Sequence, residues 1–177
     1  MFFAHYRRAR LLWILAALAV AFAAGSVPFI IEMEDKNVGI IEFELTRTAD
    51  KAEDHYQDLG PDGREDARAA LALDYAYLVS YGLFLIGACA AVSERALRRE
   101  WSRLSAIGPV IAWGALGAAV YDAVENTMLL LILEGHTDQP WPGIAFGFAV
   151  AKFVLVGIAL LYIVGGWLVT LRRRVPA

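Results

Sequence analysis

The sequence predicts an all-α membrane protein, a four-transmembrane-helix bundle with a small external β-hairpin plus helix between the first and second spans. Hydrophobic residues make up 59% of the 177 residues, and the charged 20% are gathered between long apolar runs. Each run exceeds the roughly 20 residues that a helix needs to cross a hydrocarbon layer of about 30 Å. The four runs cover residues 11–31, 69–92, 104–133 and 143–171. Since they leave no room for a separate soluble domain, residues 1–177 are expected to form a single membrane domain.

Arginine clusters predict the orientation of these spans. They lie at residues 7–10, in the loop 93–103 and at Arg172–Arg174, which is one side of the membrane if every run spans. An excess of Lys and Arg marks the cytoplasmic side. The opposite segment, residues 32–68, has twelve acidic and five basic residues, as an external segment can. We therefore predict a protein of the bacterial plasma (inner) membrane with both termini in the cytoplasm. The net charge of −3 gives no reason to expect a nucleic-acid partner.

The first run has an alternative interpretation as a signal peptide. Arginines precede an apolar stretch that reaches Ala21-Phe22-Ala23, which has the pattern of a cleavage site. The apolar run continues past that site to Ile31, however, and is long enough to span. We favour a retained span and keep cleavage as the alternative.

The external segment, residues 32–68, has two patterns of its own. Apolar and acidic residues alternate before and after Asp35-Lys36-Asn37, which is the period of half-buried strands joined by a turn. This pattern predicts the β-hairpin. A short polar helix is expected at about residues 49–59, with Thr48 or Asp50 as its cap and Gly60-Pro61 as its stop. The helix of the second span then begins outside the membrane and continues to about Val92.

Ionisable residues inside two of the spans indicate the site. Asp122 and Glu125 lie in the third span and Lys152 lies in the fourth. A charge at mid-bilayer costs roughly 2.5–3.5 kcal/mol, so unpaired charges are unexpected there. Asp122, Glu125 and Asn126 share one helix face because they are spaced at i, i+3 and i+4. Glu125 and Lys152 both lie about nine residues, or about 13 Å, from the outer ends of their spans, so they can meet.

The second span adds polar residues to the same region. Asp74, Tyr77 and Tyr81 share one face, with Asp74 nearest the outer surface. The expected ligand-binding residues, forming a funnel that opens outward, are Asp122, Glu125, Asn126, Lys152, Asp74, Tyr77 and Tyr81. Two deep carboxylates face one ammonium, which leaves uncompensated negative charge in a medium of low dielectric. A proton or a bound cation is therefore expected there.

The same residues also fit a purely structural role, because intramembrane ion pairs can fix the order of helices. No catalytic residue, cofactor or metal site is predicted. The histidines His5, His55 and His136 lack metal-ligand spacing, and Cys89 is the only cysteine. No phosphate-binding loop, nucleophile elbow or haem-attachment motif occurs.

Short motifs resemble a set found in small, uncharacterised four-helix membrane proteins of bacteria. They are Leu73-Asp74-Tyr75, Asp122-Ala123-Val124-Glu125-Asn126 and Ala151-Lys152-Phe153. That resemblance covers most of the chain and implies no particular activity. The layout is also similar to claudin-like tetraspans, whose tryptophan and paired-cysteine loop signature this sequence lacks.

Three functions fit these features. The first is a membrane protein that binds or transports a small polar, cationic or lipid-like ligand, such as an amphipathic molecule, at the outward-facing charge cluster. The second is a structural or accessory subunit that recognises a membrane-protein partner, or another copy of itself, through the external segment. The third, ranked last, is an intramembrane enzyme that uses Glu125 as a proton carrier on a lipid. Membrane lipids are expected partners in every case.

Overall fold

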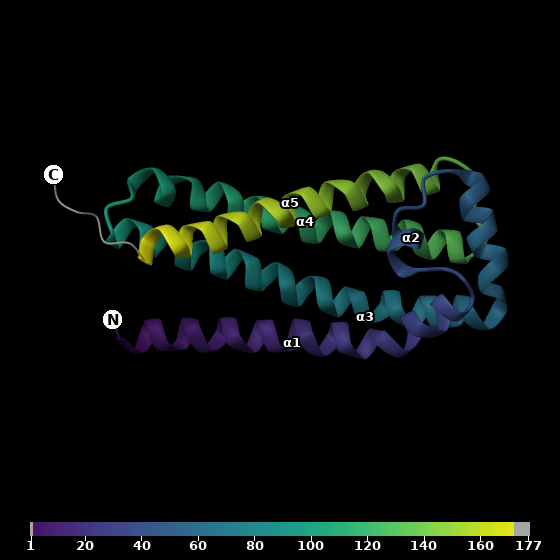
Figure 1. The fold of residues 1–177 in the computed structure, drawn as a ribbon, viewed down its shortest axis with the longest axis horizontal. Coiled ribbons are helices and arrows are strands. Elements are labelled where there is room, and N and C mark those ends of the chain that lie inside the picture. Colours follow the sequence, from purple (N-terminus) through teal and green to yellow (C-terminus); the bar gives the residue numbers. More distant parts are fainter. Residues whose placement is uncertain (1, 172–177) are drawn as a thin grey trace.

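The computed structural model describes residues 2–171, and it describes side chains from Ala9 onward. The cluster Arg172–Arg174 therefore lies outside the described residues, as do the side chains of Arg7 and Arg8. Within the described part the chain forms five helices and no strand (Figure 1). The helices are α1 (Phe2–Asp35), α2 (Ile40–Glu44), α3 (Ala49–Arg98), α4 (Ser102–Leu133) and α5 (Trp141–Leu171).

Four of the helices, α1, α3, α4 and α5, are long and apolar enough to cross a membrane. They run up and down along one long axis, so α1 begins and α5 ends at the same end of the bundle (Figure 1). We call this end, which also holds the turn between α3 and α4, the terminal end. The opposite end carries α2 and the first segment of α3, and we call it the capped end (Figure 1). The predicted all-helical fold with four apolar helices is confirmed.

The predicted β-hairpin is wrong, because α1 continues to Asp35 and residues 40–44 form a helix. The chain turns at Asn37, whose φ is 63°, and both Lys36 N and Val38 N donate to Met33 O. Alternation of Ile41, Phe43 and Leu45 suggested a strand, but residues 41 and 45 also share a helix face. In the structure Phe43 is buried while Ile41 is 55% exposed, so these residues do not form one buried strand face.

Gly60 bends α3 where the sequence predicted a stop. Its backbone has φ 61° and ψ −176°, a conformation that favours glycine because it has no Cβ. Thr48 is the N-cap, and its Oγ1 accepts a hydrogen bond of 3.4 Å from Lys51 N. The segment from Ala49 to Gly60 crosses the capped end, and the rest of α3 runs back along the bundle (Figure 1).

The capped end is packed onto the bundle rather than loosely attached. Phe43 from α2 and Met33 and Val38 beside it join one buried cluster with Leu129 and Ile132 of α4. A second buried cluster, nearer the terminal end, joins α3, α4 and α5. Helix α1 packs mainly along α3, whereas α3, α4 and α5 all contact one another. The bundle is therefore a three-helix core with α1 on its flank.

Candidate functional site

Lys152 is the centre of a buried charge cluster between α4 and α5. Its Nζ donates a hydrogen bond of 2.7 Å to Asp122 Oδ1 and lies 2.9 Å from Glu125 Oε2. The Lys152 side chain is only 8% exposed, and the carboxylates of Asp122 and Glu125 are also buried. The structure thus brings together the three residues that helix depth and spacing predicted would meet.

A third carboxylate reaches the cluster from the capped end. Glu44, the last residue of α2, has its Oε2 3.5 Å from Lys152 Nζ, and its side chain is 16% exposed. Burial raises the pKa of Glu44, with the Lys152 ammonium opposing this shift and the Asp74 and Asp122 carboxylates adding to it. Residue 44 thereby connects the capped end directly to the intramembrane charges.

Glu44 is the member of the cluster that sequence reasoning missed. The hairpin interpretation placed it among the acidic residues of the solvent-facing side of a strand. A helical interpretation places Ile40, Phe43 and Glu44 on one face, by the i, i+3, i+4 spacing. In the structure Phe43 is buried and the other two are half-buried, so the helical period contained the missing signal.

The remaining predicted residues of α3 also join the network. Tyr81 donates a hydrogen bond of 2.8 Å to Asp122 Oδ2, and the rings of Tyr77 and Tyr81 have centroids 5.1 Å apart. Asn126 Nδ2 donates a hydrogen bond of 2.6 Å to Asp74 Oδ2. Five of the seven predicted site residues are thus linked by direct contacts across α3, α4 and α5. Asp74 and Asn126 form a separate hydrogen-bonded pair, and the Asp74 carboxylate interacts electrostatically with Asp122.

Carboxylates outnumber the ammonium in this network by four to one. They are Glu44, Asp74, Asp122 and Glu125, against Lys152. Glu125 is 0% exposed, and its Oε1 has no hydrogen-bond partner in the described part of the chain. A buried carboxylate oxygen of this kind is costly unless a proton or a cation satisfies it. Among residues 2–171 no group of three His, Cys, Asp or Glu side chains is arranged to hold a metal ion.

The predicted outward funnel takes a different form in the structure. Helix α2 contacts both α4 and α5, and it places Glu44 against Lys152. With the ammonium 8% and the Glu44 side chain 16% exposed, water reaches little of either group. The cluster is therefore covered by the capped end instead of opening past it.

The fold and this site define a multi-pass helical membrane protein with an acid-rich charge cluster buried in its bundle. The chain matches no protein-family model, and comparisons with curated proteins and with solved structures give no match either. The function of this chain is therefore inferred from the site itself.

Proposed function

We propose that this protein binds or transports a small polar or cationic ligand at the charge cluster formed by Glu44, Asp122, Glu125 and Lys152. The carrying observation is the orphan Oε1 of Glu125, fully buried beside an ammonium that is shared among three carboxylates. Ionisable residues inside a membrane-spanning bundle are rare because of their cost, and they commonly mark ligand and proton pathways.

The proposal places the protein in the bacterial inner membrane with its terminal end in the cytoplasm. Arg95, Arg98, Arg99 and Arg103 gather at that end, in agreement with the positive-inside rule. The capped end, with its acidic external segment, would then face outward. A ligand from outside would reach the cluster past α2, which requires Glu44 to move away from Lys152.

Charge balance suggests how the ligand is recognised. Four carboxylates and one ammonium give a net charge of −3 if all are ionised, which a low-dielectric site does not tolerate. We infer that protons neutralise part of this charge in the empty protein, with Glu125 as the proton carrier. A ligand ammonium or an inorganic cation entering the cluster would replace such a proton, so binding would release protons.

Infrared spectroscopy of the purified protein tests this directly. The wild-type protein in detergent at pH 7 should show the carbonyl stretch of a protonated carboxylic acid, and Glu125→Gln should remove it. Glu42→Gln, which changes an exposed acid of the same α2 region, is the matched control and should keep it. Titration with sodium, potassium, choline and spermidine should identify a cation that removes the band and acidifies an unbuffered solution.

A different result would refute ligand binding at the charge cluster. If no protonated carboxyl is seen and none of the four cations changes the spectrum or the unfolding temperature, the cluster is a structural device that fixes helix order. That result would favour the hypothesis that the protein is an accessory subunit of another membrane protein. It would be tested by reversing the exposed acids Glu42, Asp50 and Glu53 and measuring whether a co-purifying membrane protein is lost.

A further inference from the structure

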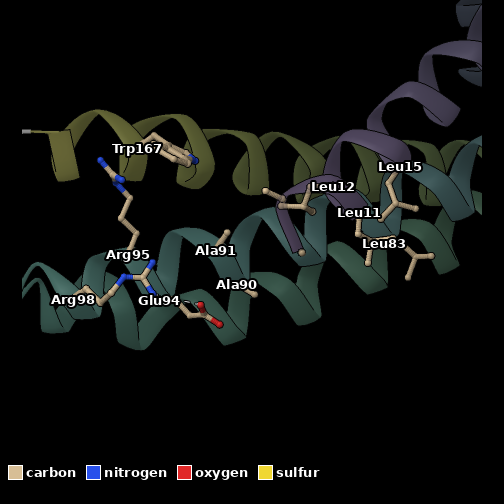
Figure 2. A pocket seen from close by; sticks show the side chains of 12 residues that line it. Leu11, Leu12, Leu15, Leu83, Ala90, Ala91, Glu94, Arg95, Arg98 and Trp167 are labelled. Atoms are coloured by element: carbon tan, nitrogen blue, oxygen red, sulfur yellow. Dashed lines mark ion pairs between the residues drawn. The ribbon is translucent and has the colours of Figure 1, made fainter. Parts of the chain in front are cut away.

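A second candidate site lies at the terminal end, far along the bundle from the charge cluster. A groove of about 490 Å³ opens between α1, α3 and α5. Its deeper part is lined by four leucines, and its outer part is lined by polar side chains beside a tryptophan (Figure 2). The leucines are Leu11, Leu12, Leu15 and Leu83, and the outer residues are Glu94, Arg95, Arg98 and Trp167.

The groove lies beside a close contact between α1 and α3, where α1 leaves part of α5 uncovered. Gly87 allows this approach, since a Cβ there would lie 2.6 Å from Leu12 Cδ2. Beyond that contact Ala90 and Ala91 line the groove, and because their side chains are small they leave it unfilled. A volume of about 490 Å³ is within the range of sites for small ligands, which are mostly apolar with a few polar groups.

Arg95 is held in place at the mouth of the groove. Its Nε donates a hydrogen bond of 2.9 Å to Thr170 Oγ1, and its guanidinium lies 4.5 Å from the centre of the Trp167 ring (Figure 2). That hydrogen bond uses one of the five N–H groups of an arginine, so it leaves the terminal nitrogens for another acceptor. Arginine suits phosphate because two of its N–H groups can bind two phosphate oxygens at once.

Arg98 adds a second cation on the next turn of α3. It lies 3.7 Å from Glu94, and both side chains are about half exposed, so this pair is weak. Two arginines and one glutamate give the mouth a net positive charge. Basic pockets between membrane helices are suited to anionic lipid headgroups. Trp167 fits the same depth, because tryptophan is enriched at the interface between hydrocarbon and water.

The length of the groove matches one leaflet of a bilayer. Arg95 and Leu83 are twelve residues apart on α3, which is about 18 Å at 1.5 Å per residue. Half of a hydrocarbon layer of about 30 Å is about 15 Å, so the leucines would lie near the middle of the membrane. A soluble anion would use the arginines but not the leucines.

We therefore propose that this groove binds an anionic phospholipid of the leaflet at the terminal end. Its phosphate contacts Arg95 and Arg98, and one acyl chain lies along Leu12, Leu15 and Leu83. This site is separate from the charge cluster, and its proposal does not depend on the function proposed there.

Native mass spectrometry of the full chain, after removal of its lipids, tests the proposal with dioleoyl phosphatidylglycerol and dioleoyl phosphatidylcholine as probes. The wild type should bind phosphatidylglycerol about thirty times more tightly, since each of the two arginines near the headgroup contributes about fivefold. The double variant Arg95→Gln, Arg98→Gln should lose this preference. Arg10→Gln with Arg99→Gln removes the same charge from exposed positions at the same end, and should change binding less than twofold.

Two further variants separate headgroup from acyl-chain contacts. Arg98→Gln alone changes a side chain that is 56% exposed, so it keeps the test valid if loss of Arg95 disturbs the packing of Trp167. It should weaken phosphatidylglycerol binding about fivefold. Ala91→Leu fills the groove and should weaken both lipids. Equal losses in the Arg10/Arg99 control would overturn the proposal in favour of general surface charge. Unchanged binding in Ala91→Leu would show that the groove holds no acyl chain.

Discussion

Replacing Lys152 with methionine tests the central contact of the bundle. Methionine fills a similar volume but removes the ammonium, whose Nζ lies 2.7, 2.9 and 3.5 Å from oxygens of Asp122, Glu125 and Glu44. Breaking a buried ion pair from one side costs about 3–5 kcal/mol, because the partner charge stays buried without compensation. The variant is therefore expected to be strongly destabilised at neutral pH.

The size of the stability loss follows from the cost of protonating a carboxylate that has lost its partner. An orphaned carboxylate can take up a proton, and for an ordinary carboxyl with a pKa of about 4.3 this costs about 1.36 kcal/mol per pH unit above that value. At pH 7 the cost for one carboxyl is about 3.7 kcal/mol, and at pH 5 it is about 1 kcal/mol. Lys152→Met should thus lower the free energy of unfolding by about 3–4 kcal/mol at pH 7 and by only about 1 kcal/mol at pH 5.

Titration with sodium dodecyl sulfate in dodecyl maltoside micelles, followed by tryptophan fluorescence, measures this free energy at both pH values. Lys51→Met is the matched control, because the Lys51 side chain is 62% exposed and its Nζ lies 3.8 Å from Glu42 Oε1. This substitution should lower the free energy of unfolding by less than about 1 kcal/mol. Adding Asp122→Asn to Lys152→Met should recover most of the loss, since it removes the carboxylate that accepts the Lys152 hydrogen bond and would otherwise be left as an orphaned charge. A loss below about 1 kcal/mol at pH 7, or one that is equal at both pH values, would refute the argument.

Substitutions at three other positions examine the capped end by the same unfolding measurement. Phe43→Ala should lower the free energy of unfolding by about 3–5 kcal/mol, because this fully buried ring joins α2 to the bundle. It should also speed hydrogen exchange in residues 38–46, and unchanged exchange there would contradict this packing. Thr48→Ala should cost about 1 kcal/mol through loss of the α3 N-cap, and Thr48→Ser, which keeps the acceptor, should not. Burial raises the pKa of Glu44, so its stabilising contribution is present below the ordinary value and is lost as pH rises through the raised one. Glu44→Gln should therefore weaken the decline of wild-type stability above about pH 4.5, and an unaltered pH profile would count against it.

The long elements could be predicted because length and hydrophobicity alone decide them. An apolar run of more than 20 residues has no stable alternative to a helix inside a membrane, where every backbone N–H and C=O must be satisfied within the chain. The contacts among Asp122, Glu125 and Lys152 could be predicted for a related reason. The spacing of residues along a helix determines which helix face they share, and the rise per residue determines their depth in the membrane. Because an unpaired charge is costly there, the charged faces of neighbouring helices are expected to contact each other.

The external segment could not be predicted with the same rule. Over the few residues around Phe43, alternation fits a strand, but residues 41 and 45 are also neighbours on a helix. What decides between them is tertiary: Val38 and Phe43 are buried against Leu129 and Ile132 of a helix that lies far along the chain. The position of Glu44 follows from that packing, so an error in the local structure became an error in the site.

Glu44 gives the external segment a physical means of controlling the charge cluster. While α2 is packed on the bundle, Glu44 lies 3.5 Å from Lys152, and burial favours its neutral form. If α2 moves away, Glu44 enters water and ionises at its ordinary pKa, while Lys152 keeps only Asp122 and Glu125 as partners. Movement of α2 and release of a proton from Glu44 are therefore coupled, because Glu44 belongs to both the external segment and the cluster.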